Sequence, residues 1–169
     1  MDRGVVSAID MATEIRRLSE AEIEPLIEEL WFPFAEEMAS IEEFNELADD
    51  IRSEAIEYRQ SQFADEDVRI YVALEDEDMI GMASAKRTSS PPIFVRGDAI
   101  HLKELYVMPD HRGKGIGTAL LDEVEGWAEA ESRTHVTLSV EAENEEALGF
   151  YQAQGFDIKR HKMAKRLDE

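Results

Sequence analysis

Apolar and polar residues along the chain switch several times between a period of two and a period of about 3.6. A period of two indicates strands with one buried face, and a period of 3.6 indicates amphipathic helices. The resulting order is typical of a mixed sheet covered by helices. The predicted elements are a strand at 14–18, helical residues from 19 to about 62, a hairpin of strands at 68–74 and 79–87, a strand at 99–107, a helix from 116, a strand at 136–140, a helix at 144–154 and a strand at 156–164.

Several of these helices carry boundary signals. Ser19, followed three residues later by Glu22, matches a capping box. Asn144 is a natural N-cap, and Gly155 is a natural residue just beyond a helix C-terminus. Pro33 is expected to interrupt the first helical region. A second helix there is predicted to carry Ile41, Phe44, Leu47, Ala48 and Ile51, and the helix from 116 presents Ile116, Leu120, Val124 and Trp127 on one face.

The length of 169 residues fits one domain with a real core, since 43% of the residues are hydrophobic. Residues 1–12 lack periodicity and are interpreted as a loose leader, and residues 13–169 as a single domain. No apolar run reaches the length of about 20 residues that spans a bilayer, and no signal-like segment opens the chain. We therefore expect a cytoplasmic protein with no membrane partner.

The chain has a formal net charge of −21, from 39 acidic against 18 basic residues. Such a balance argues against nucleic acid as a partner, because phosphate contacts need lysine and arginine. We interpret the acidic surface as typical of a halophilic, acidic proteome, since molar salt screens self-repulsion. The absence of cysteine excludes an acyl-cysteine intermediate, and the four scattered histidines predict no metal site.

The run LYVMPDHRGKGIGTALL at 105–121 is the strongest chemical signal. An apolar strand ends, a polar turn follows, and three glycines at alternate positions open a helix. Bare backbone amides at a helix N-terminus form a ready site for phosphate. The spacing matches neither a dinucleotide fingerprint nor a Walker loop. The plain alternative is a tight strand-to-helix turn with no ligand.

The pattern Arg112-x-x-Gly115-x-Gly117 resembles the acyl-CoA pyrophosphate loop of the GNAT (GCN5-related) N-acetyltransferase superfamily. A second segment, Asn144-x-x-Ala147-x-x-Phe150-Tyr151 with Gly155-Phe156, is similar to another segment of that superfamily. Residues 100–107 show a weaker local likeness to diamine and polyamine acetyltransferases. The resemblance implies an α/β (α+β mixed sheet) acyl-CoA N-acyltransferase fold, with a mostly antiparallel twisted sheet of six to seven strands and helices on both faces.

The resemblance also implies roles for individual residues. The strand edge would pair with the pantetheine arm of acetyl-CoA, and the Val107 amide would donate to the thioester oxygen. Asn144 would contact the pantetheine, cap its helix, or do both. Tyr151 would be the general acid beside the sulfur, because a phenol with an ordinary pKa near 10 stays protonated at neutral pH. The implied cofactor-binding residues are Leu105, Tyr106, Val107, Arg112, Gly113, Lys114, Gly115, Ile116, Gly117, Asn144 and Tyr151.

Two side chains on the strand before the loop are candidates for the general base. His101 stands where several GNAT enzymes carry a base, and Glu104 is the second candidate. Strict alternation would put His101 and Lys103 on one face and Glu104 on the other, unless a bulge re-aims the carboxylate. Polyamine-type enzymes have a carboxylate at the position of Lys103, so the chain departs from them there. Loss of the proton through water is a third alternative.

These features predict an acetyl-CoA-dependent N-acetyltransferase that acetylates a primary amine by direct attack in a ternary complex. The acceptor would be a small-molecule amine or a peptide amine, and no metal is expected. A homodimer is compatible with the family, in which edge strands often pair. Two alternatives stay open: the same fold acylating a protein N-terminus, and a CoA-binding regulatory module without catalysis.

Overall fold

The computed structural model describes residues 13–168, which divide into two compact units, 13–139 and 140–168. Each unit is described by itself, and the expectation of one domain over 13–169 stays a prediction. In the first unit the elements are β1 (Thr13–Arg17), η1 (Glu20–Glu22), α2 (Ile23–Leu26), η2 (Ile27–Trp31), α3 (Phe32–Ile41), η3 (Glu43–Asn45), α4 (Arg52–Ala64), β2 (Val68–Glu75), β3 (Asp78–Thr88), β4 (Ala99–Val107), η4 (Pro109–His111), α5 (Ile116–Ala130) and β5 (His135–Leu138). The second unit contains α6 (Glu145–Ala153).

The sheet has five strands in the order β1-β2-β3-β4-β5. Neighbours from β1 to β4 are antiparallel, and β4 pairs with β5 in parallel. The mixed α/β architecture is thus as predicted, but within residues 13–168 the strands number five rather than six or seven. The predicted strand at 156–164 is wrong, since these residues form no strand. Alternation alone does not make a strand, because the backbone also needs a partner to pair with.

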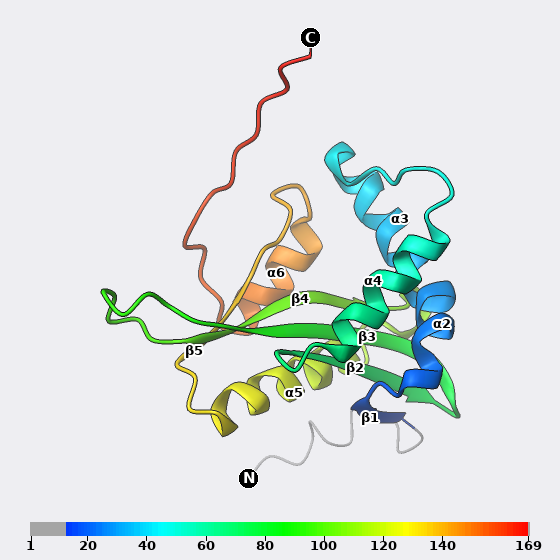
Figure 1. Cartoon of the computed structure of the whole chain (residues 1–169), viewed down its shortest axis with the longest axis horizontal. Coiled ribbons are helices and arrows are strands. Elements are labelled where there is room, and N and C mark those ends of the chain that lie inside the picture. The colour runs from blue at the N-terminus through cyan, green and yellow to red at the C-terminus, as the bar shows by residue number, and fades with distance from the viewer. Residues whose placement is uncertain (1–12, 169) are drawn as a thin grey trace. The chain divides into compact units, whose positions relative to one another are not determined.

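Helices cover both faces of this sheet (Figure 1). The segment from η1 to α4 lies on one face, where Leu26 and Leu30 pack with Val72 and Met82 in the main apolar cluster. Helix α5 lies on the opposite face, where Leu120 approaches Gly81 of β3 so closely that an added Cβ would stand 3.3 Å from it. The face predicted for this helix is confirmed, because Ile116, Leu120, Val124 and Trp127 are all buried.

Pro33 does not interrupt the first helical region. A π-helical turn, η2, leads directly into α3, and Pro33 stands in the first turn of α3. The Phe32 N–H donates to the Ile27 carbonyl, five residues back, and Pro33 follows without an N–H to donate. The widened turn before it removes the usual conflict with the preceding carbonyl groups.

The second helix predicted around residues 41–51 is wrong. Helix α3 ends at Ile41, and the next α-helix begins at Arg52. Asp50 adopts a left-handed backbone with φ of 54°, which breaks the helical path just before α4. Phe44, expected on a buried face, is 56% exposed. By contrast, the predicted capping box is confirmed, because the Ser19 N–H donates to the Glu22 carboxylate at 2.9 Å.

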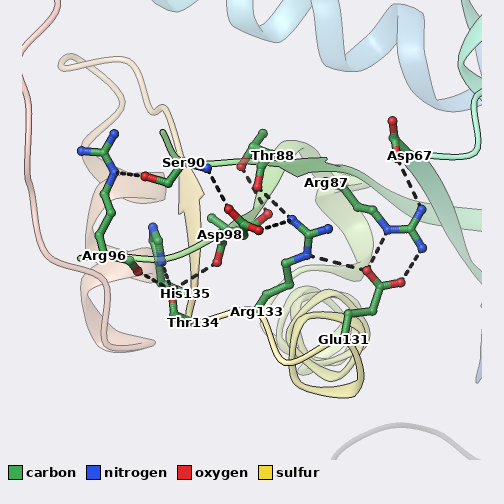
Figure 2. Close-up of polar contacts among 11 residues, drawn as sticks. Asp67, Arg87, Thr88, Ser90, Arg96, Asp98, Glu131, Arg133, Thr134 and His135 are labelled. Carbon is green, nitrogen blue, oxygen red and sulfur yellow. Dashed lines mark hydrogen bonds and ion pairs between the residues drawn. The ribbon is translucent and has the colours of Figure 1, made fainter. Parts of the chain in front are cut away.

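A network of charged side chains joins the end of α5 to the β3–β4 hairpin (Figure 2). Arg87 of β3 donates from Nε to Glu131 Oε1 at 2.7 Å, and Arg133 Nη1 donates to the Thr88 carbonyl at 2.9 Å. The Arg87 hydrogen bonds hold the pKa of Glu131 at about 2. Arg87 also lies 5.3 Å from the ring centre of Trp127. These contacts fix the C-terminal end of α5 and so orient its N-terminal end.

Candidate functional site

The glycine-rich loop connects β4 to the start of α5, as predicted. Gly115 is the N-cap of α5 with φ of 86°, and Gly113 has φ of 79°. Both values lie in the left-handed region, which glycine adopts without a steric penalty. A Cβ on Gly113 would meet nothing within 4 Å, so this side of the loop is open.

The loop presents backbone amides that the fold leaves available. The first α-helical bond at this end runs from the Ala119 N–H to the Gly115 carbonyl, and the amides of Ile116 and Gly117 stand in the first turn before it. No acidic residue stands in the first turn of α5, although the chain contains 39 aspartates and glutamates. A helix N-terminus carries positive potential, and here no carboxylate in its first turn competes for it. Gly113, Lys114, Gly115, Ile116 and Gly117 lie together in this turn, and their binding of an anion stays a prediction.

Two amides of β4 point toward its open edge. The Met108 N–H donates to the Ile80 carbonyl at 2.9 Å, and Gly81 lies opposite Val107. Bonded and non-bonded pairs alternate in an antiparallel ladder, so Val107 and Leu105 direct their N–H groups away from β3. The pairing with β5 covers only Ala99–Leu102, and in the described part of the chain no strand continues along this edge. The backbone of Tyr106, which lies between these two residues, pairs with β3.

Arg112 stabilises this corner rather than pointing into the loop. Its Nε donates to the Val107 carbonyl at 2.8 Å, and its Nη2 donates to Glu37 of α3 at 2.8 Å. Its guanidinium also lies 5.5 Å from the ring centre of Tyr106. The Arg112 side chain is thus engaged, whereas Lys114 is exposed beside the amides.

A β-bulge changes which residues of β4 share a face. Ser84 pairs with Glu104 but Ala85 pairs with Leu102, which leaves Lys103 as the extra residue. Because cross-strand partners lie on the same face, this shift puts His101 on the face of Glu104. Strict alternation, which separates His101 from Glu104, is therefore wrong here, and the bulge named as its exception is present. Lys103 also lies on the side of α4, because its Nζ donates to the Tyr58 hydroxyl. The bulge brings both base candidates to the face covered by α4.

Glu104 is held by two partners. Arg59 of α4 donates to both carboxylate oxygens, Nη1 to Oε1 at 2.7 Å and Nη2 to Oε2 at 3.0 Å. The Ser84 hydroxyl donates to Oε1 at 2.6 Å. Burial works against the charged form, but Arg59 and Ser84 outweigh it, and the pKa of Glu104 lies below its usual value. A carboxylate occupied in this way is a poor proton acceptor near neutral pH.

His101 is better suited than Glu104 to act as the general base. Its Nδ1 lies 2.8 Å from the Thr137 hydroxyl of β5, which leaves Nε2 as the other ring nitrogen. Burial, aided by the charge of Lys103, lowers the pKa of His101. The imidazole is consequently neutral at physiological pH, as a general base requires.

Asn144 and Tyr151 belong to the second unit. The Asn144 side chain accepts from the Ala147 N–H at 3.1 Å, so its capping role is confirmed and its contact with pantetheine stays a prediction. Tyr151 packs edge-on against Phe150 and Phe156, with ring centres 5.3 and 5.7 Å away. Burial raises the pKa of Tyr151 to about 12, so its phenol is protonated at neutral pH. Gly155 follows α6 with φ of 98°, as expected of a residue beyond the C-cap.

Sequence reasoning missed the Arg59–Glu104 pair and left a bulge in this strand as an open alternative. In the sequence, Arg59 is one of many charged residues of an acidic helix. In the structure, its side chain is only 1% exposed. No local signal marks the bulge, because it arises from pairing between β3 and β4. Among residues 13–168, no group of three potential ligands is placed to hold a metal ion. No helix in that range is both long and apolar enough to cross a membrane.

The chain belongs to the Acetyltransferase (GNAT) family, whose model matches residues 24–156. The resemblance seen in the sequence is thereby confirmed. An uncharacterized N-acetyltransferase of Methanocaldococcus jannaschii is 40% identical over 62 residues, which are 37% of this chain. The chain matches only 27% of the length of that relative.

Solved structures share the fold. A predicted acetyltransferase with acetyl-CoA from Clostridium acetobutylicum has a TM-score of 0.72 at 21% identity, covering 92% of this chain and 96% of that one. An aminoglycoside antibiotic 6'-N-acetyltransferase from Acinetobacter haemolyticus has a TM-score of 0.70 at 22% identity, covering 92% and 99%. At these identities the likeness establishes the GNAT fold.

Proposed function

We propose that this protein is an acetyl-CoA-dependent N-acetyltransferase that acetylates a primary amine by direct attack in a ternary complex. The single observation that carries the proposal is the turn at 113–117, which stands at the N-terminus of α5, together with the Leu105 and Val107 N–H groups that face the open edge of β4. A diphosphate fits the turn because its charge meets the positive N-terminal end of α5, where no carboxylate stands in the first turn. An extended amide-containing arm fits the strand edge as an added strand.

When bound, acetyl-CoA supplies an activated acetyl group as a thioester. The Val107 N–H is the donor available to an oxygen that gains negative charge at the strand edge. His101 Nε2 accepts a proton from the acceptor amine, and the buried phenol of Tyr151 retains a proton that it can deliver to a departing thiolate. Since the chain has no cysteine, no acyl-cysteine is formed on the way.

The comparisons support acyl transfer to a small-molecule amine, and a peptide amine is the second acceptor that the proposal allows. Family membership supports acyl transfer as the reaction class, and one structural neighbour is an aminoglycoside acetyltransferase. The alternatives are acylation of a protein N-terminus and a regulatory CoA-binding module. A regulatory module has no use for a protonated phenol, so Tyr151 favours an enzyme. A cytoplasmic location and adaptation to salt belong to the same proposal.

The test is CoA binding by calorimetry, combined with thiol release from acetyl-CoA over a panel of amines. Gly115→Asn and Gly115→Asp carry the same strain at a left-handed position and differ by one charge. We expect the asparagine variant to weaken CoA binding and the aspartate variant to abolish it. Gly126→Asp places the same charge on an exposed, open position of α5 and should bind normally. Retained binding by Gly115→Asp would remove the turn from the site.

A further inference from the structure

The bulge residue Lys103 has an unusual setting for this chain. It is exposed, has no partner on β3, and its Nζ donates to the Tyr58 hydroxyl of α4 at 3.1 Å. Its ammonium lies 5.6 Å from the centre of the Tyr58 ring. In a protein with 39 acidic residues, its partner is a phenol rather than a carboxylate.

The carboxylate on the adjacent residue is already neutralised. Glu104 is held by both Nη atoms of Arg59 and by Ser84, and the three groups together carry no net charge. The face of the sheet beside the bulge therefore retains the positive charge of Lys103. Burial, together with the charge of Lys103, lowers the pKa of His101, and Lys103 acts in the same direction on the pKa of Glu104.

Hydrogen-bonding capacity at this corner points to an anionic ligand. The Tyr58 oxygen accepts from Lys103 at 3.1 Å and from Gln62 Nε2 at 3.4 Å. The phenol hydrogen is then directed away from both donors, and Lys103 keeps two further N–H groups. Tyr58 is 56% exposed, so these donors face solvent. Three donors and one positive charge match the oxygens of a carboxylate.

We propose that Lys103 and Tyr58 bind a carboxylate of the acceptor, so that the substrate is an amine that also carries a carboxylate, as amino acids and acidic peptides do. This inference rests on the proposed function and narrows its substrate class. Polyamines and aminoglycosides would bring further positive charge against Lys103 and are expected to be poor acceptors. A free amino acid and a peptide with an acidic side chain offer the same chemistry, and the test separates them.

The experiment measures kcat/KM for thiol release with matched acceptors. One arm compares free amino acids with their methyl esters, and the other compares peptides that differ only by Glu or Gln at the second position. The quantity of interest is the preference for the charged member over its neutral partner. The preference is a ratio of two kcat/KM values. When it is compared between wild type and Lys103→Met, differences in the chemical reactivity of the amines themselves drop out. The arm in which the preference depends on Lys103 identifies the source of the carboxylate.

We expect Lys103→Met to reduce the preference at least about tenfold and Tyr58→Phe to reduce it less, in line with loss of charge-assisted hydrogen bonds. Arg52→Met is the control, because Arg52 is an exposed cation of α4 that is paired with Glu28. It removes the same charge and should leave the preference unchanged. If amines are acetylated but the preference does not depend on Lys103, this inference is overturned while the proposed function holds. If no amine in the panel releases thiol, the proposed function fails and this inference with it.

Discussion

Arg112 joins two parts of the candidate site, because its Nε donates to the carbonyl oxygen of Val107 at 2.8 Å. Arg112, which directly precedes the turn at 113–117, thereby fixes the end of the strand whose N–H groups face the open edge. Its other contact, with Glu37, ties the same corner to α3. The loop, the strand end and the helix are held as one arrangement.

Arg112→Met is expected to weaken CoA binding about tenfold by loosening this corner, consistent with the loss of hydrogen bonds to a charged group. If Arg112 acts by positioning, Glu37→Gln weakens binding in the same direction, although it removes no positive charge. Calorimetry at two salt concentrations measures both effects. Arg52→Met, at an exposed ion pair with Glu28, is the control. Tighter binding in Glu37→Gln would instead indicate that Arg112 is free to contact phosphate.

The Arg59–Glu104 pair should matter more for stability than for proton transfer. Arg59→Met leaves a buried carboxylate without its partner and should cost about 3–5 kcal/mol of the free energy of unfolding. The double variant with Glu104→Gln should cost less than the sum of the two single variants, because the charge is then removed. Denaturant titration measures all three.

The pH dependence of this stabilisation has a definite sign. The pKa of Glu104 is lowered in the folded protein, so its contribution is present above the unfolded value and is lost as pH falls through the folded value. Arg59→Met removes the two largest causes that lower this pKa, so burial should dominate and the dependence should reverse, with stability falling as pH rises through the raised pKa. If the free energy of unfolding of Arg59→Met depended on pH as in the wild type, Glu104 would not be the group responsible.

His101 should define the acidic limb of the activity profile. Because burial and Lys103 lower its pKa, kcat/KM should rise with pH through a midpoint below 6.5, the ordinary value for histidine. Lys103→Met should move that midpoint upward, and Thr137→Val should disturb it by removing the partner of Nδ1. His101→Gln should abolish the limb. A limb that persists in this variant would assign proton loss to water or another group.

Tyr151→Phe should lower turnover at least about tenfold and leave CoA affinity nearly unchanged, since it removes a proton donor and little surface. With a pKa of about 12, the phenol in the wild type should show no alkaline loss of its acid role below about pH 11. Stopped-flow or steady-state thiol release measures the first effect, and calorimetry the second. Phe150→Leu changes the neighbouring ring without removing a hydroxyl and serves as the control.

The net charge of −21 predicts that molar KCl stabilises the fold. We expect the midpoint of thermal unfolding to rise with KCl, because screening reduces repulsion among surface carboxylates. Sodium chloride at equal ionic strength is the comparison that separates screening from a specific ion. Full stability and activity in salt-free buffer, with no gain on adding salt, would contradict the expectation.

Local patterns in the sequence determined much of the site. The strand ending at Val107, the helix from Ile116 and the left-handed glycines between them follow from residues close together in the chain, where periodicity and the backbone freedom of glycine decide the structure. The caps at Ser19 and Asn144 are local in the same way. Family membership also followed from two short segments.

Tertiary structure decided the rest, for reasons that no local pattern contains. The bulge at Lys103 comes from the register between β3 and β4, and it reverses the face on which His101 lies. The charge state of Glu104 depends on Arg59, 45 residues earlier in the chain, whose burial is a product of packing. Pro33 stays within helical structure because a π-turn precedes it, and residues 156–164 form no strand because a strand needs a partner. Periodicity specifies which residues can be buried, whereas pairing and packing decide which of them meet.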